Sequence, residues 1–87
     1  MKKYMLFSAT RRCQPCMVLV NMLNKEVPNW EEVIEYIDVD NATEKQMEIA
    51  KNLKVMRLPS FTDQDQILFK GFSLDIFKSI KDICTKG

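Results

Sequence analysis

The chain has 87 residues, of which 46% are hydrophobic and 29% are charged, as is ordinary for a soluble globular domain. Its 13 basic and 12 acidic side chains leave a formal net charge of +1, so neither nucleic acid nor an acidic membrane surface is expected as a partner. No apolar run approaches the roughly 20 residues of a membrane span, and the apolar stretch near the N-terminus is too short for a signal peptide. We therefore expect a single domain over residues 1–87 that stays in the cytoplasm.

The first expected elements are a strand and a helix with a Cys-x-x-Cys pair between them. The continuous apolar run Tyr4-Met5-Leu6-Phe7 predicts a central strand from Lys3 to Phe7. Apolar side chains then repeat every three or four residues, which predicts a helix from Cys13 to about Lys25. Pro15 suits the first turn of this helix, because residues there need no intrahelical N–H partner. Cys13 is then expected at the helix cap and Cys16 one turn inside.

The middle of the chain predicts a second strand and a second helix. Proline breaks the first helical pattern at residues 27–30, and Val33–Val39 is rich in the β-branched and aromatic residues typical of a strand. The second helix, expected to end near residue 53, has two candidate starts. Asn41 and Glu44 stand at capping-box spacing, and Thr43 is a rival cap. The side chains expected to face inward are Met47, Ala50 and Leu53.

The last third of the chain predicts a β-hairpin and a third helix. Its strands are expected at Ser60–Thr62 and Ile67–Lys70, on either side of a polar turn that lacks glycine. Gly71 allows a tight turn, and Ser73 is expected to cap the last helix. The buried stripe of that helix is expected to hold Ile76, Phe77, Ile80, Ile83 and Cys84. The resulting order, β-α-β-α-β-β-α, predicts an α/β fold whose mixed four-stranded sheet is flanked by helices on both faces.

The cysteine pair carries the strongest signal for chemistry. A helix N-terminus directs exposed N–H groups and a partial positive charge at Cys13, which favours a thiolate there. A thiolate attacks disulfides, and a second thiol one turn away, at Cys16, can resolve the mixed disulfide. Arg12 adjoins the nucleophile, so we hypothesise that it lowers the pKa of Cys13.

Two alternatives to redox chemistry remain open for this pair. The first is a metal site, although tetrahedral zinc needs four ligands and the chain offers three cysteines and no histidine. Zinc would therefore need carboxylate ligands or a second chain, and no metal is expected. The second is a binding module that uses the same fold without turnover. Cys84, on the stripe of the last helix, is expected to be a small buried hydrophobe.

Three motifs match a known family in sequence and in place. They are Cys13-Gln14-Pro15-Cys16 after the first strand, Leu58-Pro59-Ser60-Phe61 before the third and Gly71-Phe72-Ser73 after the fourth. On these residues the chain resembles the thioredoxin superfamily over nearly its whole length, which implies a thioredoxin-like fold. Its length and first element are similar to a glutaredoxin, whereas the Cys-x-Pro-Cys proline and Asp38-Val39-Asp40 are similar to thioredoxin. The chain is similar to small hybrid members found in phages and prokaryotes.

The resemblance implies a role for several residues. Cys13 matches the exposed nucleophile and Cys16 the buried resolving thiol. Pro59 matches a cis-proline, beside which the main chain of Leu58 pairs with the substrate. The residues expected to contact a substrate are Arg12, Gln14, Pro15, Leu58, Pro59, Phe72 and Ser73.

The chain also departs from the family at functional positions. Arg12 replaces the tryptophan that precedes the first cysteine in thioredoxins, and Phe7 replaces their buried acid. The proton of Cys16 is therefore expected to go to water or to an acid such as Asp40. Ser73 stands where an aspartate often helps to bind glutathione, although the N–H groups of Phe72 and Ser73 could still hold a carboxylate.

The function that follows is that of a thiol–disulfide oxidoreductase, a small electron carrier that reduces protein disulfides. Ribonucleotide reductase is a possible substrate by resemblance alone. The electron donor is expected to be a flavoprotein of the thioredoxin reductase type or glutathione, with no organic cofactor. We expect a monomer.

Overall fold

The computed structural model describes residues 2–86, which form four strands, three α-helices and one short 3-10 helix. The strands are β1 (Tyr4–Ser8), β2 (Ile34–Asp38), β3 (Ser60–Thr62) and β4 (Ile67–Lys70). The helices are α1 (Gln14–Glu26), α2 (Glu44–Leu53) and α3 (Leu74–Lys86), with the 3-10 helix η1 (Trp30–Glu32) between α1 and β2. Within these residues no helix combines the length and the apolar character needed to cross a membrane.

The strands form one sheet in the order β2-β1-β3-β4. β1 runs parallel to β2 and antiparallel to β3, and β3 runs antiparallel to β4. The continuously apolar β1 is therefore central, as its sequence predicts. The predicted α/β class and the mixed four-stranded sheet are confirmed.

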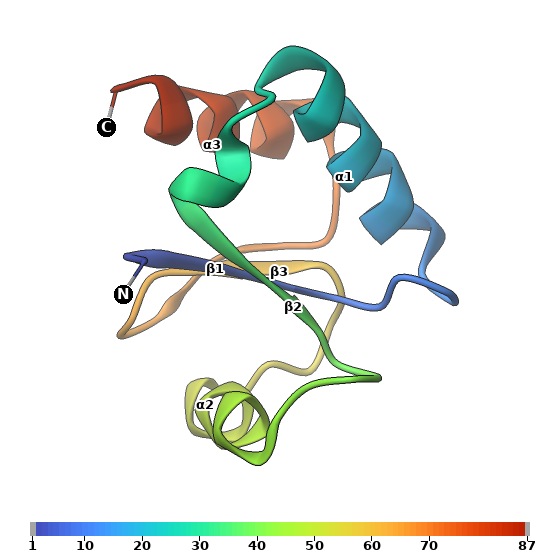
Figure 1. Ribbon diagram of the computed structural model, residues 1–87, viewed down its shortest axis with the longest axis vertical. Coiled ribbons are helices and arrows are strands. Elements are labelled where there is room, and N and C mark those ends of the chain that lie inside the picture. Colours follow the sequence, from blue (N-terminus) through green and yellow to red (C-terminus); the bar gives the residue numbers. More distant parts are fainter. Residues whose placement is uncertain (1, 87) are drawn as a thin grey trace.

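This register gives the sheet two chemically different ends. Ser8 lies beside Asp38, and the residues before Ser60 approach the same side, because Ser60 pairs with the end of β1. We call this the disulfide end, since Cys13 follows β1 there. The opposite end is formed by Tyr4 and Thr62, where β1 begins and β3 leads into the hairpin turn. In Figure 1 the disulfide end faces right and the N-terminal end of β1 faces left.

The helices cover both faces of the sheet. Figure 1 shows α1 and α3 on one face and α2 on the other. Between the sheet and the α1–α3 layer lies a cluster of buried side chains that includes Leu6, Leu19, Phe61 and Ile80. A smaller cluster on the α2 side contains Met5, Phe7, Ile37 and Ala50. The alternation of Leu6 and Phe7 between the two clusters is the period-two pattern of a strand buried on both faces.

The start of α2 and its inward face differ from part of the prediction. Thr43 is the N-cap, and its hydroxyl and the side chain of Gln46 form a reciprocal capping box. The rival box of Asn41 and Glu44 is therefore not formed, because the helix begins at Glu44. Met47 is 43% exposed, so the expectation that it faces inward is wrong. Ala50 is buried and Leu53 packs against the same cluster, as expected, and Ile49 faces inward instead of Met47.

The hairpin and the last helix follow the prediction closely. β3 and β4 have the expected bounds, and Asp63 replaces the missing glycine in the turn between them. Its Oδ1 accepts hydrogen bonds from the backbone N–H of Asp65 at 2.7 Å and of Gln66 at 2.8 Å, so side-chain bonding holds the turn. In α3 the expected stripe faces the core, with Phe77, Ile80 and Cys84 buried and Ile76 and Ile83 partly buried.

Candidate active site

The cysteine pair lies at the start of α1, after the loop that follows β1. Cys13 has extended dihedral angles and is the N-cap, and its Sγ accepts a hydrogen bond from the backbone N–H of Cys16 at 3.3 Å. Pro15 stands within the first turn of the helix, which contains no acidic residue. A sulfur at this position receives an N–H donor and the positive end of the helix dipole, with no opposing carboxylate in the first turn of the helix.

The two sulfurs are joined but differ in access. Cys13 and Cys16 form a disulfide with a Cα–Cα distance of 5.2 Å. The Cys16 residue is completely buried, whereas Cys13 is partly exposed. An incoming group can therefore reach the Cys13 sulfur and not that of Cys16.

A groove of about 430 Å³ runs beside Cys13 along the first turns of α1. Arg11, Arg12 and Gln14 give it a polar rim, and Val18, which is 39% exposed, gives it an apolar side. The remaining lining residues are Met17 and Asn21. The groove offers both cationic and apolar contacts directly beside the accessible sulfur.

Arg12 is paired with Asp40 across two loops. The Arg12 Nε donates to Asp40 Oδ1 at 3.1 Å and to Oδ2 at 3.0 Å, and the two residues are 28 positions apart in the chain. The hydrogen bond with Asp40, and then its negative charge, raise the pKa of the Arg12 guanidinium. From the sequence, Arg12 is expected to act on the Cys13 sulfur, and water or an acid such as Asp40 is expected to accept the proton of Cys16. In the structure, which contains the disulfide, the two groups instead bind each other.

A hydroxyl network at the disulfide end was not expected from the sequence. The fully buried Ser8 donates through Oγ to the hydroxyl of Tyr36 at 2.7 Å, and Thr10 Oγ1 lies 2.7 Å from the same hydroxyl. Nearby, hydrogen bonds from the Asn41 side chain and the Asp40 backbone hold the pKa of Asp38 below its usual value. The sequence gives only a weak signal for this network. The alternation of side chains along a strand places Tyr36 on the same face of the sheet as the apolar Ile34.

Leu58 and Pro59 lie at the same end of the sheet as Cys13. The Leu58–Pro59 peptide bond is cis, as the resemblance implies. Pro59 is buried, and its carbonyl accepts a hydrogen bond from the backbone N–H of Gly71 at 2.7 Å. The main chain of Leu58 has no hydrogen-bond partner within the described residues 2–86, so it is available to another chain.

Phe72 and Ser73 join β4 to α3, next to the Gly71–Pro59 hydrogen bond. Ser73 caps α3, because its Oγ accepts from the backbone N–H of Ile76 at 3.1 Å. Phe72 is partly buried and packs against the core cluster. Ser73 therefore has a structural task in addition to any contact with a ligand.

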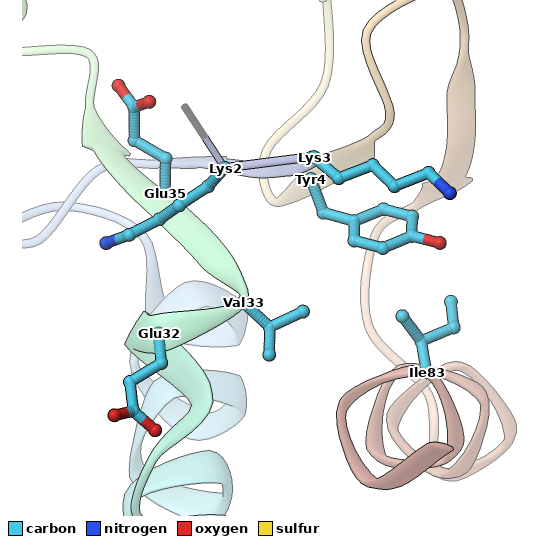
Figure 2. Close-up of a pocket in the computed structure, with 7 residues that line it drawn as sticks. All are labelled: Lys2, Lys3, Tyr4, Glu32, Val33, Glu35 and Ile83. Carbon is cyan, nitrogen blue, oxygen red and sulfur yellow. The ribbon is translucent and has the colours of Figure 1, made fainter. Parts of the chain in front are cut away.

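A second pocket, of about 850 Å³, lies at the opposite end of the sheet (Figure 2). Tyr4, Val33 and Ile83 face one another across its opening, and the remaining lining residues are Lys2, Lys3, Glu32 and Glu35. The pocket is larger than the groove beside Cys13 but contains no cysteine. We therefore assign the chemistry to the smaller groove.

Comparisons with other proteins add no assignment to this picture. Neither the models of known protein families nor the curated protein sequences that were searched match the chain. Within residues 2–86, no cluster of three or more His, Cys, Asp or Glu side chains has the geometry to hold a metal ion. The disulfide and the residues around it are therefore the features of the molecule that bear on its function.

Proposed function

We propose that the chain is a thiol–disulfide oxidoreductase of the thioredoxin-like type, which reduces protein disulfides. The observation that carries the proposal is the asymmetry of the cysteine pair. Cys13 is accessible at the N-terminus of α1, and Cys16 is buried one turn later at bonding distance. A nucleophile needs access and a lowered pKa, whereas a resolving thiol needs only proximity to the first sulfur.

The reaction would proceed in two exchanges. The thiolate of reduced Cys13 attacks one sulfur of the substrate disulfide, which forms a mixed disulfide and releases the other substrate sulfur as a thiolate that takes up a proton. Cys16 then loses its proton and attacks the Cys13 sulfur. This step forms the Cys13–Cys16 bond and releases the second substrate thiol. The substrate gains two electrons and two protons, which the dithiol loses.

The surroundings of the pair favour an extended protein substrate. The unpaired main chain of Leu58 offers a donor and an acceptor at the disulfide end, while the groove along α1 offers Val18 and Met17 to an apolar side chain. The donor that resets the disulfide would be a flavoprotein reductase or glutathione. Ribonucleotide reductase remains a candidate substrate that rests on the resemblance alone, and no organic cofactor is required by this cycle.

Turnover of a fluorogenic peptide disulfide with dithiothreitol as electron donor tests the proposal. The wild-type chain is expected to accelerate reduction, and Cys13→Ser to abolish the acceleration, because it removes the nucleophile. Cys16→Ser should trap a mixed disulfide on Cys13 that mass spectrometry detects. Cys84→Ala is the matched control, because Cys84 forms no disulfide and lies in the core, and it should turn over like the wild type. Equal rates for the wild type and Cys13→Ser would exclude the proposed enzyme.

The pH dependence of Cys13 alkylation in reduced Cys16→Ser is an independent test. An apparent pKa of about 7 or below is expected for a thiolate at a helix N-terminus, against about 8.5 for a free cysteine. Cys84 should not interfere, because burial raises its pKa. An apparent pKa near the free value, together with metal in the purified protein, would favour a metal-binding protein instead.

A further inference from the structure

We propose that Asp40 is a positioning residue that sets the reactivity of Cys13 by holding Arg12 in an ion pair, away from the sulfur. The inference rests on the proposed function and concerns the regulation of the same site. It follows from the pairing of two side chains that the local sequence does not bring together.

The ion pair joins the two loops at the disulfide end. Arg12 belongs to the loop before Cys13, and Asp40 to the loop after β2. A single guanidinium nitrogen, Nε, contacts both carboxylate oxygens, at 3.1 and 3.0 Å. The side chains are 63% and 40% exposed, so neither is confined by packing. The guanidinium can therefore turn from one anion to another without a change in the core.

A second anion arises beside Arg12 when the disulfide is reduced. Two electrons from a thiol reductant, such as the dithiothreitol of the turnover assay, break the Cys13–Cys16 bond, and the reductant becomes a disulfide. The Cys16 sulfur takes up a proton, and the Cys13 sulfur is left as a thiolate. Arg12 and Cys13 line the same groove, so the thiolate and Asp40 compete for one guanidinium. While Arg12 is paired with Asp40, the two charges nearly cancel, so the pair contributes little to the stabilisation of the thiolate.

Two other charged groups lie at this end, and neither is paired with Arg12. Arg11 lines the groove and forms no ion pair with any residue of the described chain, 2–86. Asp38 is the last residue of β2, and its carboxylate accepts hydrogen bonds from the Asn41 side chain and the Asp40 backbone. Asp40 is thus the acid that restrains the cation nearest to Cys13 in the chain, and its loss should release that cation to the sulfur.

A cycle of four proteins, all with Cys16→Ser, tests this role through the alkylation rate of Cys13 below its pKa. Asp40→Asn is expected to raise the rate about two- to fivefold, the factor that corresponds to one exposed ion pair. Arg12→Ala should lower it by a smaller factor, because the Asp40 carboxylate then loses its counter-charge and its uncompensated negative charge at the disulfide end disfavours the thiolate. In the double variant the rate should return close to that of the parent.

One result of this cycle distinguishes a positioning role for Asp40 from two independent charge effects on the alkylation rate. If Asp40 holds Arg12 away from the sulfur, Arg12→Ala should change the rate more in the Asp40→Asn background than in the parent. An equal factor in both backgrounds would mean that the two charges act independently, and it would overturn the proposal. No change on Asp40→Asn would overturn it as well. Asp40→Glu, which keeps the carboxylate, should restore a rate near that of the parent.

Two controls separate this result from other causes. Asp65→Asn removes an equal charge in the hairpin turn at the opposite end, and it should leave the rate unchanged. The alkylation assay needs no turnover, so its outcome is independent of the peptide disulfide assay. If turnover is absent but the four proteins show the coupling, the proposed function fails and the inference about Asp40 stands. If turnover is present but the coupling is absent, the proposed function stands and the inference about Asp40 fails.

Discussion

The two ends of the sheet use the same local device for different purposes. At the disulfide end, Asp38 accepts hydrogen bonds from the Asp40 backbone and the Asn41 side chain; at the opposite end, Asp63 accepts two from the backbone of its own turn. In both places one carboxylate shapes a loop without glycine, and in both the hydrogen bonds hold the pKa of that carboxyl below its usual value.

The difference lies in what the two loops present to the rest of the molecule. The loop after Asp38 carries Asp40 to Arg12 and lies beside the hydroxyls that meet at Tyr36. At the opposite end the ring of Tyr4 stacks on Phe61 with centroids 5.5 Å apart, and lysine and glutamate side chains line a pocket that contains no cysteine. A stable turn with charged side chains near it therefore carries no redox chemistry by itself. What distinguishes the disulfide end is the partly exposed Cys13.

Replacing the hydroxyl of one tyrosine at each end should give the largest difference in stability. Tyr36→Phe is expected to lower the free energy of unfolding by about 1–3 kcal/mol, because it leaves the buried Ser8 hydroxyl without an acceptor. Tyr4→Phe is the control, since the Tyr4 hydroxyl makes no hydrogen bond within residues 2–86, and it should change stability by less than about 0.5 kcal/mol. Urea unfolding of the oxidised proteins measures both. Equal losses would contradict a structural role for the hydroxyl network.

The loop at the disulfide end is also anchored by the start of α2. Thr43→Ala removes the hydroxyl of the capping box and should cost about 1 kcal/mol. Thr85→Ala makes the same chemical change near the exposed end of α3, where the hydroxyl bonds only to the Asp82 carbonyl, and should cost less than about 0.5 kcal/mol. Thermal unfolding of the two variants compares them. A loss at Thr43 no larger than that at Thr85 would mean that the cap adds nothing to the packing of α2.

The smallest expected effect is the response of the two aspartates to acid. The pKa values of both aspartates are lowered in the folded protein, so both side chains stabilise it at a pH above the pKa of an unfolded aspartate, about 3.9. This stabilisation is lost as the pH falls through the lower pKa values of the folded protein. Asp38→Asn and Asp63→Asn should each flatten the decline of stability at acidic pH.

The two variants should differ at neutral pH, where both aspartates are charged. Asp63 uses one oxygen, Oδ1, for both hydrogen bonds, and an asparagine can keep that acceptor. Asp38 uses both oxygens, and an asparagine loses one of them as an acceptor. Urea unfolding at neutral pH should therefore show the larger loss for Asp38→Asn. A larger loss for Asp63→Asn would contradict this account of the two loops.

Much of the fold could be predicted because its signals are local. The cap at Cys13, the bounds of β3 and β4 and the buried stripe of α3 all depend on spacings within one element. Where two local signals competed, as at Asn41 and Thr43, the sequence alone did not decide between them. Met47 was misplaced because the inward face of α2 depends on how the helix lies on the sheet, which places Ile49 inward instead.

The candidate site was predictable only in part, for a related reason. The positions of Cys13 and Cys16 follow from one turn of one helix. The Arg12–Asp40 ion pair spans 28 residues, as does the Ser8–Tyr36 hydrogen bond. Both depend on the parallel pairing of β1 with β2, which brings their following loops together. No spacing pattern within a single element reports such a contact.

Gly71 shows how two further loops are constrained as a single unit. Its backbone has φ of +79°, and a Cβ at this position would meet the Arg57 guanidinium at 3.4 Å from Nε. Its N–H also bonds to the Pro59 carbonyl. A larger residue at position 71 would therefore find only an ordinary van der Waals contact with Arg57, and its cost would be the strain of a positive φ. In evolutionary terms position 71 is tied to the backbone rather than to its neighbours' side chains: a lineage that replaces the glycine must either keep a positive φ with a strained residue or lose the N–H that bonds to Pro59.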